Sequence, residues 1–139
     1  MASLTKIMTA ITSIEIACEL KINIHKVWFI VSKYASTMIG TTAGLVEQQR
    51  VTIFDLLHGL MLPSGNDAAM TLAENFSERL RELKKRGDGK VVQDGRKTFS
   101  PFVKRMNKLA FKLHLRNTNY TNPHGLADKA NHSTAYELA

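Results

Sequence analysis

A serine and a lysine near the start of the chain have a spacing that suits acyl-transfer chemistry. Ser3 and Lys6 form an S-x-x-K pattern, and residues three apart lie on one face of a helix, so the amine can reach the hydroxyl. A neutral lysine can take the proton of a serine and make it a nucleophile if burial or a nearby cation lowers the lysine pKa. The pattern is common, however, and by itself a capping serine beside a surface lysine is the simpler interpretation.

A second group of polar residues lies in a turn further along the chain. Ser64-Gly65-Asn66 follows Pro63 between two expected helices, where side chains can project into a cleft. The Ser64 hydroxyl could relay a proton toward a leaving group. The Asn66 amide could bind a substrate carbonyl while helping to hold the lysine. Spacing alone does not separate this reading from a plain turn with an Asn helix cap.

Two longer strings resolve the ambiguity. Ala2–Ala10 (ASLTKIMTA) and Leu56–Ala69 (LLHGLMLPSGNDAA) resemble the first and second motif regions of the low-molecular-mass penicillin-binding D-Ala-D-Ala carboxypeptidases, a class with S-x-x-K, a second serine triplet and K-T-G. The likeness continues in the same order through the segments 106–107, 115–120, 122–126 and 133–134. It therefore covers nearly the whole chain.

The resemblance implies a role for each of these polar residues. Ser3 would be acylated by a D-Ala-D-Ala-terminated peptidoglycan stem peptide, Lys6 would take its proton, and Ser64 would pass a proton onward. Asn66 would help to bind substrate, and β-lactam antibiotics would be further ligands. No cofactor and no metal is implied. His124 receives a structural place in a turn and is left out of the catalytic set.

The chain departs from the family pattern where a third motif is expected. No K-T-G follows before Ala139, and Lys97-Thr98-Phe99 lacks the glycine and comes too early. The strands that precede the S-x-x-K helix in the family are absent too. We therefore predict an α+β chain that forms the mainly helical portion of the β-lactamase/transpeptidase-like fold, with most of the central antiparallel sheet missing. Residues 1–139 would be a partial catalytic domain, whose helices expose apolar surface.

Two other functions remain open at this stage. A catalytically inactive truncated relative could act as a binding or structural protein through its basic surface. The β-lactamase branch shares the acylation chemistry, but no Glu lies in a recognisable deacylating context. Covalent labelling by a penicillin would separate an enzyme from a binding protein.

The elements that must position these residues can be outlined from hydrophobic spacing. Residues 3–19 form a helix that we expect to be buried on much of its circumference, with Ser3 capping its start and Cys18 as a small buried hydrophobe. Its apolar positions are Leu4, Ile7, Met8, Ile11, Ile14, Ala17 and Cys18. Extended runs are expected at 27–31, 45–46 and 51–53, and further helices at 55–61, from Asn66, from Pro101 and near 133–137.

Composition fits one ordinary soluble domain. The chain has 139 residues, 44% of them hydrophobic, and no apolar run approaches the ~18 to 20 residues that a membrane span needs. The formal net charge of +7 is concentrated in a basic stretch at 84–98, which we interpret as an inserted surface loop. An anionic polymer could bind there, whereas nucleic acid is not expected. No signal peptide is visible, and an extracytoplasmic location is implied only by the resemblance.

Overall fold

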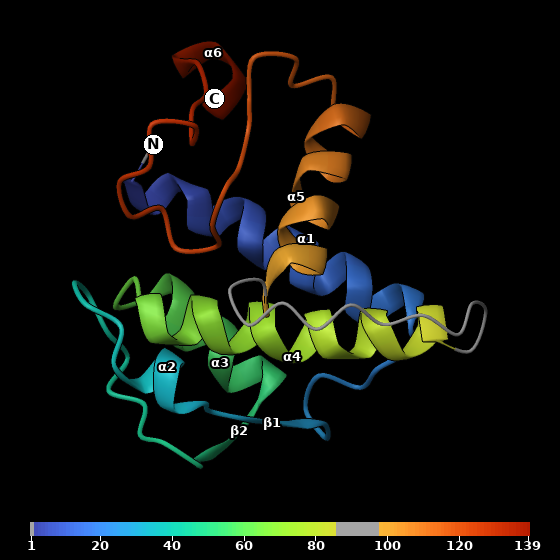
Figure 1. Cartoon of the computed structure of the whole chain (residues 1–139), viewed down its shortest axis with the longest axis vertical. Helices are drawn as coiled ribbons and strands as arrows, with labels where there is room; N and C mark the ends of the chain where they lie inside the picture. Colours follow the sequence, from blue (N-terminus) through green and yellow to red (C-terminus); the bar gives the residue numbers. More distant parts are fainter. Residues whose placement is uncertain (1, 86–97) are drawn as a thin grey trace.

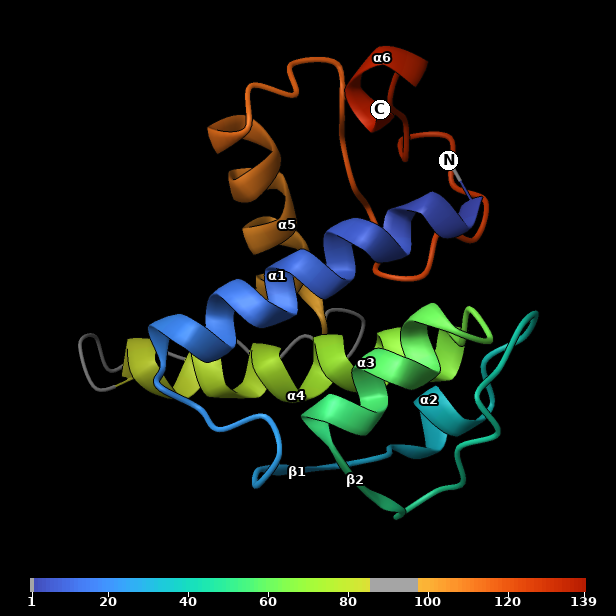
Figure 2. The same ribbon diagram turned by 180° about the vertical axis from the view of Figure 1, so that it is seen from behind.

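The computed structural model describes residues 2–85 and 98–139, and helix α1 lies at the centre of them. A 3-10 turn, Ala2–Leu4, leads directly into α1, Thr5–Glu19. In Figures 1 and 2, α1 runs between α3 and α4 on one side and α5 with the C-terminal segment on the other. The first turn of α1 is therefore reached by segments that are far away in the sequence.

Five further helices follow α1 within the described residues. Helix α3, Ile53–Met61, begins at Thr52, whose hydroxyl accepts the Asp55 N–H at 3.1 Å. Helix α4, Asn66–Lys85, follows the Pro63 turn, and α5, Ser100–Lys112, has Pro101 in its first turn, as the sequence predicts. Helix α6, Ala135–Leu138, is capped by Thr134. Short α2, Lys33–Ser36, is capped by Ser32.

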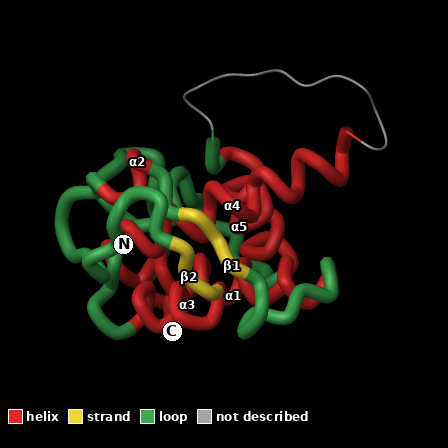
Figure 3. Tube along the Cα trace, turned by 90° about the horizontal axis from the view of Figure 1, so that it is seen from below, coloured by secondary structure: helices red, strands yellow, loops and turns green. Residues whose placement is uncertain are grey.

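A small antiparallel ribbon lies beneath these helices, as Figure 3 shows. Strand β1, Trp28–Ile30, pairs with β2, Arg50–Thr52, and Phe29 faces Val51 in the register. The extended run expected at 45–46 is not a strand, because its backbone N–H groups bond to the side chains of Asp67 and Gln49 instead. The described residues hold this two-stranded sheet only, which agrees with a mainly helical chain.

The core is formed where α4 packs on α3, α1, α5 and the ribbon. Three fully buried aromatic rings connect these elements: Phe29 meets Phe76 edge to face at 4.9 Å between ring centroids, and Phe76 stacks on Phe102 at 6.2 Å. Each aromatic side chain of this size removes a large apolar area from water. Helix α4 is therefore the main support for both the ribbon and α5.

The buried side of α1 is not the one that hydrophobic spacing predicts. The apolar residues on its outer side are 42% to 48% exposed: Leu4, Ile7, Ile11 and Ile14. Cys18 is exposed as well, so the prediction of a buried thiol is wrong. Met8, Ile16 and Ala17 are buried, but most of the residues packed with them are polar: Thr5, Lys6, Thr9, Thr12 and Ser13. Helix α1 thus exposes an apolar stripe, as expected for a helical portion with little sheet.

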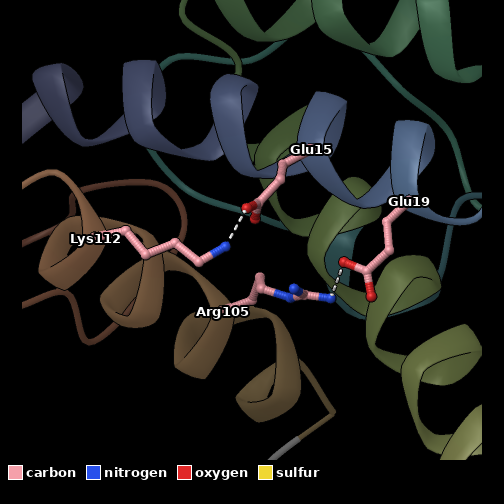
Figure 4. A network of polar contacts seen from close by, with 4 residues as sticks. All are labelled: Glu15, Glu19, Arg105 and Lys112. Atoms are coloured by element: carbon pink, nitrogen blue, oxygen red, sulfur yellow. Dashed lines mark hydrogen bonds and ion pairs between the residues drawn. The ribbon is translucent and has the colours of Figure 1, made fainter.

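Two ion pairs connect α5 to the second half of α1. Arg105 contacts Glu19 at 2.5 Å and Lys112 contacts Glu15 at 3.0 Å, and Figure 4 shows both basic side chains reaching from α5 toward α1. Glu19 and Lys112 are about half exposed, so each pair adds little free energy by itself. Their value is geometric, because they fix which side of α5 faces α1.

Two further predictions from the sequence concern the basic stretch and the absence of a membrane-spanning helix. The basic stretch at 84–98 lies largely outside the described residues, apart from its first two lysines at the end of α4 and Thr98. Among the described helices, none is long and apolar enough to cross a membrane.

Candidate active site

Ser3 and Lys6 lie together at the start of α1, with Ser64 beside them. The Ser3 hydroxyl oxygen accepts a hydrogen bond from the Ser64 hydroxyl at 2.8 Å and lies 3.4 Å from the Lys6 amine. The predicted capping role of Ser3 is wrong, because α1 starts after Leu4 with no side-chain cap. The Ser3 hydroxyl is instead shared between a lysine on the same helix and a serine from the α3–α4 turn.

Lys6 is buried to an unusual degree for a lysine, with 3% of its surface exposed. Burial lowers the pKa of its amine, because the charged form loses its hydration. Besides Ser3, the amine donates to the backbone carbonyl of His124 at 2.8 Å. In the neutral amine, one N–H can stay on this carbonyl while the lone pair accepts the serine proton. This burial distinguishes Lys6 from the surface lysine of the simpler interpretation.

A tight loop from Asn122 to Leu126 supplies the carbonyl that holds Lys6. The Asn122 side chain closes the loop by accepting the Gly125 N–H at 2.7 Å and donating to the Leu126 carbonyl at 3.1 Å. Thr9 anchors the loop to α1 through the Pro123 carbonyl at 2.6 Å. Gly125 has φ +83°, and a side chain there would meet the backbone oxygen of Ala2 at 1.9 Å. Only glycine allows this close approach.

His124 enters the site through its backbone and not through its ring. Its Nδ1 accepts the Leu126 N–H at 3.1 Å, which assigns the ring proton of the neutral form to Nε2. Burial, together with the positive charge of Lys6, lowers the pKa of His124 to about 4. The sequence placed His124 in a structural turn but missed its carbonyl as the partner of Lys6. The neighbouring Asn, Pro and Gly indicated a tight loop, yet nothing in them identified the partner.

The α3–α4 turn presents Ser64 in a left-handed backbone conformation, with φ +59°. A second loop holds it there, since Thr41 donates its hydroxyl to the Ser64 carbonyl at 2.6 Å and accepts the Asn66 N–H at 2.8 Å through its own carbonyl. The buried Asn66 amide donates to the Ile39 carbonyl at 2.7 Å. This amide therefore bonds to the loop, whereas the sequence had it helping to hold Lys6; its substrate role stays a prediction.

Asp67 organises the same loop, and sequence reasoning missed it. Its buried carboxylate accepts the N–H groups of Ala43 at 2.8 Å and Leu45 at 2.9 Å and the Thr42 hydroxyl at 2.5 Å. Burial alone would raise the pKa of Asp67, but these bonds and one from Ala68 outweigh it, so the pKa lies below its ordinary value. An acidic residue in the first turn of a helix was the available signal, but it does not reveal the loop partners.

A cavity of about 420 Å³ opens beside Ser3. It is lined by Ala2, Ser3, Leu4, Lys6, Leu60, Met61 and Ser64. Three polar side chains therefore meet at an otherwise apolar hollow, which is the usual character of a small-molecule site. Within residues 2–85 and 98–139, no cluster of three or more His, Cys, Asp or Glu side chains could hold a metal ion.

Comparison with known proteins identifies the family of this chain. The family described as D-alanyl-D-alanine carboxypeptidase (Peptidase_S11) matches residues 1–85 and 95–139. The carboxypeptidase DacF of Bacillus subtilis is 34% identical over 99% of this chain and 30% of its own length. The basic insertion predicted at 84–98 overlaps the gap between the two matched ranges, but its structure lies outside the described residues.

Solved structures resemble the whole described fold. The DD-transpeptidase of Streptomyces K15 is 30% identical with a TM-score of 0.78, covering 99% of this chain and 47% of its own. Penicillin binding protein 5 from Haemophilus influenzae is 30% identical with a TM-score of 0.77, covering 99% and 35%. The chain thus spans less than half the length of these relatives. It belongs to the D-alanyl-D-alanine carboxypeptidase family and forms the mainly helical part of the family's β-lactamase/transpeptidase-like fold.

Proposed function

We propose that residues 1–139 supply the nucleophile and the proton-transfer groups of a serine-type D-Ala-D-Ala carboxypeptidase. The observation that carries this proposal is the position of the Ser3 hydroxyl, 3.4 Å from the buried Lys6 amine and 2.8 Å from Ser64 on the wall of the cavity. A capping serine and a surface lysine would not converge on a second serine in an apolar hollow. The relatives' names supply the substrate class, a peptide ending in D-Ala-D-Ala.

The chemistry follows from the proton positions around Ser3. The Ser3 oxygen attacks the carbonyl carbon of the terminal D-Ala-D-Ala bond while its proton passes to the neutral Lys6 amine. As the carbon–nitrogen bond breaks, a proton reaches the leaving D-alanine amine through Ser64, and an ester on Ser3 remains. Water then cleaves this ester, which returns a proton to Ser3. The His124 carbonyl keeps the Lys6 amine in place during both steps.

Other features of the site support binding of the acyl group. Leu4, Leu60 and Met61 supply an apolar wall beside the nucleophile, against which the side chain of a bound acyl group would pack. Asn66 would bind a substrate carbonyl once its loop bond to Ile39 is exchanged or shared. A K-T-G strand, which the family uses as its third element, has no counterpart within residues 1–139. We propose that activity needs this element, and that the active protein lies outside the cytoplasm.

Covalent labelling tests the proposal directly. A fluorescent penicillin is incubated with the intact protein that carries these residues, and labelled peptide is mapped by mass spectrometry. We expect one adduct on Ser3, because an acyl-enzyme with a β-lactam uses the same attack. Ser3→Ala should remove the adduct, whereas the matched Ser36→Ala change on α2 should leave it intact.

The result separates the enzyme from the binding-protein alternative. If the folded protein is not labelled, or if Ser3→Ala is labelled as well as the wild type, Ser3 is not the nucleophile. Folding of each variant is followed by thermal unfolding. Release of D-alanine from a D-Ala-D-Ala peptide then shows whether the adduct belongs to a carboxypeptidase.

A further inference from the structure

The side of α5 that faces away from the core combines cations with a large apolar side chain. Lys104, Lys108 and Phe111 follow one another at steps of four and three residues, so they share one helix face. Phe111 is 79% exposed. The buried residues of α5 lie on the opposite face: Phe102, Met106, Leu109 and Ala110. An exposed Phe on the outer face contributes nothing to this core.

The charge of this region has one sign. From Ser100 to Ala127 the sequence contains five Lys or Arg and no Asp or Glu. Arg105 and Lys112 are used by the ion pairs with α1, on the flank drawn in Figure 4. Among the described residues, no ion pair holds Lys104, Lys108 or Arg116. These three cations are therefore available to an anionic partner.

The C-terminal end of α5 adds a third cation beyond this face. Leu113 continues the side of Met106 and Leu109, and after His114, which has a left-handed φ of +61°, the exposed Arg116 follows. In Figures 1 and 2 this end of α5 lies at the outer edge of the molecule, remote from α3 and α4. We call Lys104, Lys108, Phe111 and Arg116 the α5 tip.

We propose that the α5 tip docks on the surface of an anionic lipid bilayer. Lys and Arg near a negatively charged leaflet each contribute about 1 kcal/mol of attraction, and apolar side chains on the same surface gain by entering the headgroup region. A dissolved polyanion would use the cations but leave the ring of Phe111 in water. The exposed aromatic ring therefore favours a lipid surface. The proposal goes beyond the carboxypeptidase function and does not depend on it.

Sedimentation with vesicles tests the docking surface. The intact protein is mixed with vesicles of phosphatidylcholine containing 30% phosphatidylglycerol, or of phosphatidylcholine alone. We expect binding to the anionic vesicles only, weakened by salt. Lys108→Glu should weaken binding about tenfold or more, and Phe111→Ser by a factor on the order of ten. Lys108→Arg should bind like the wild type.

Matched changes elsewhere control for charge and exposure. Lys26→Glu alters the net charge equally, and Tyr136→Ser removes an aromatic ring that is 92% exposed. Both should leave vesicle binding within about twofold of the wild type. All four altered side chains are exposed, so loss of the fold is not expected. Thermal unfolding of each variant checks this.

Three results would overturn the proposal. One is equal binding to neutral vesicles, and another is a Lys108→Glu variant that binds as well as Lys26→Glu does. In the third, Phe111→Ser leaves binding unchanged and dissolved polyphosphate abolishes it. This result would identify a soluble polyanion as the partner. Penicillin labelling of Ser3 should be the same in all these variants, so failure here is distinguishable from failure of the proposed function.

Discussion

The two sides of α1 have the reverse of the usual composition. Toward α3, α4 and α5 the helix buries hydroxyl groups and a lysine, whereas its outer side exposes Leu4, Ile7, Ile11 and Ile14. Part of the buried polarity is satisfied, since Thr9 bonds to the Pro123 carbonyl and Ser13 to the Thr9 carbonyl. The hydroxyls of Thr5 and Thr12 have no partner among the described residues, which costs about 1–3 kcal/mol for each.

This difference shows that α1 is shaped by the site more than by the core of these 139 residues. Its polar side holds Lys6 next to the 122–126 loop, and the apolar residues that it buries are Met8, Ile16 and Ala17. Its outer side leaves Ile7, Ile11 and Ile14 more than 40% exposed.

Removing the lysine should abolish most acylation while keeping the helix. Lys6→Met deletes the proposed base, and general-base groups contribute about 100 to 10,000-fold in rate. The acylation rate with a fluorescent penicillin should fall by this factor at a pH where the wild-type amine is neutral, and by less at lower pH. In the wild type, the rate should rise with pH as the amine, whose pKa is lowered by burial, becomes neutral. A variant that keeps both rate and pH dependence would assign the base to another group.

The close approach of the 122–126 loop to α1 should depend on one glycine. Gly125→Ala puts a Cβ 1.9 Å from the Ala2 oxygen at φ +83°, so the loop must move, at a cost of about 3 kcal/mol or more. Gly44→Ala is the control, since φ is +75° there but no atom lies within 4 Å, and about 1 kcal/mol is expected. Denaturant unfolding measures both. Equal costs would show that the contact with Ala2 is unimportant.

His124 in the 122–126 loop should make the free energy of unfolding depend on pH. A His124 pKa lowered from 6.5 to about 4 means that the unfolded chain binds the proton more readily. Stability is therefore fully present above pH 6.5 and is lost progressively as pH falls toward 4, by about 3 kcal/mol in total. His124→Gln should flatten this dependence in unfolding measured between pH 7 and 4. If the variant shows the same slope as the wild type, other groups cause it.

Much of the fold could be predicted because its signals are local. Local residues determine the backbone conformation at three places: the turn at Pro63, the helix start at Pro101 and the β-branched run around Val51. The burial of α1 could not be predicted in this way. Spacing identifies a helix with an apolar stripe, but which side is covered depends on α3, α4 and α5. The loop at 45–46 is a similar case, because the side chains of Asp67 and Gln49 accept its backbone N–H groups.

The same distinction between local and distant signals holds for the candidate site. Ser3 and Lys6 are three residues apart, so their proximity follows from the helix alone, and resemblance to a family added Ser64 from a distant turn. The His124 carbonyl is a backbone acceptor for the Lys6 amine, and the Asp67 carboxylate accepts backbone N–H groups of a distant loop. Backbone partners carry no residue-type signal. The sequence therefore indicated three side chains that lie together at the cavity and missed the groups that hold them.

The smallest effect is expected on the exposed side of α1. Ile11 is 42% exposed, so Ile11→Ala should change the free energy of unfolding of the 139-residue chain by no more than about 0.5 kcal/mol. Ile16, fully buried on the same helix, is the matched control, and Ile16→Ala should cost about 2–5 kcal/mol. A loss at Ile11 comparable with that at Ile16 would mean that the stripe is covered in solution. Repeating the pair in the longer protein then asks whether further chain covers it, since only in that case should Ile11→Ala become costly.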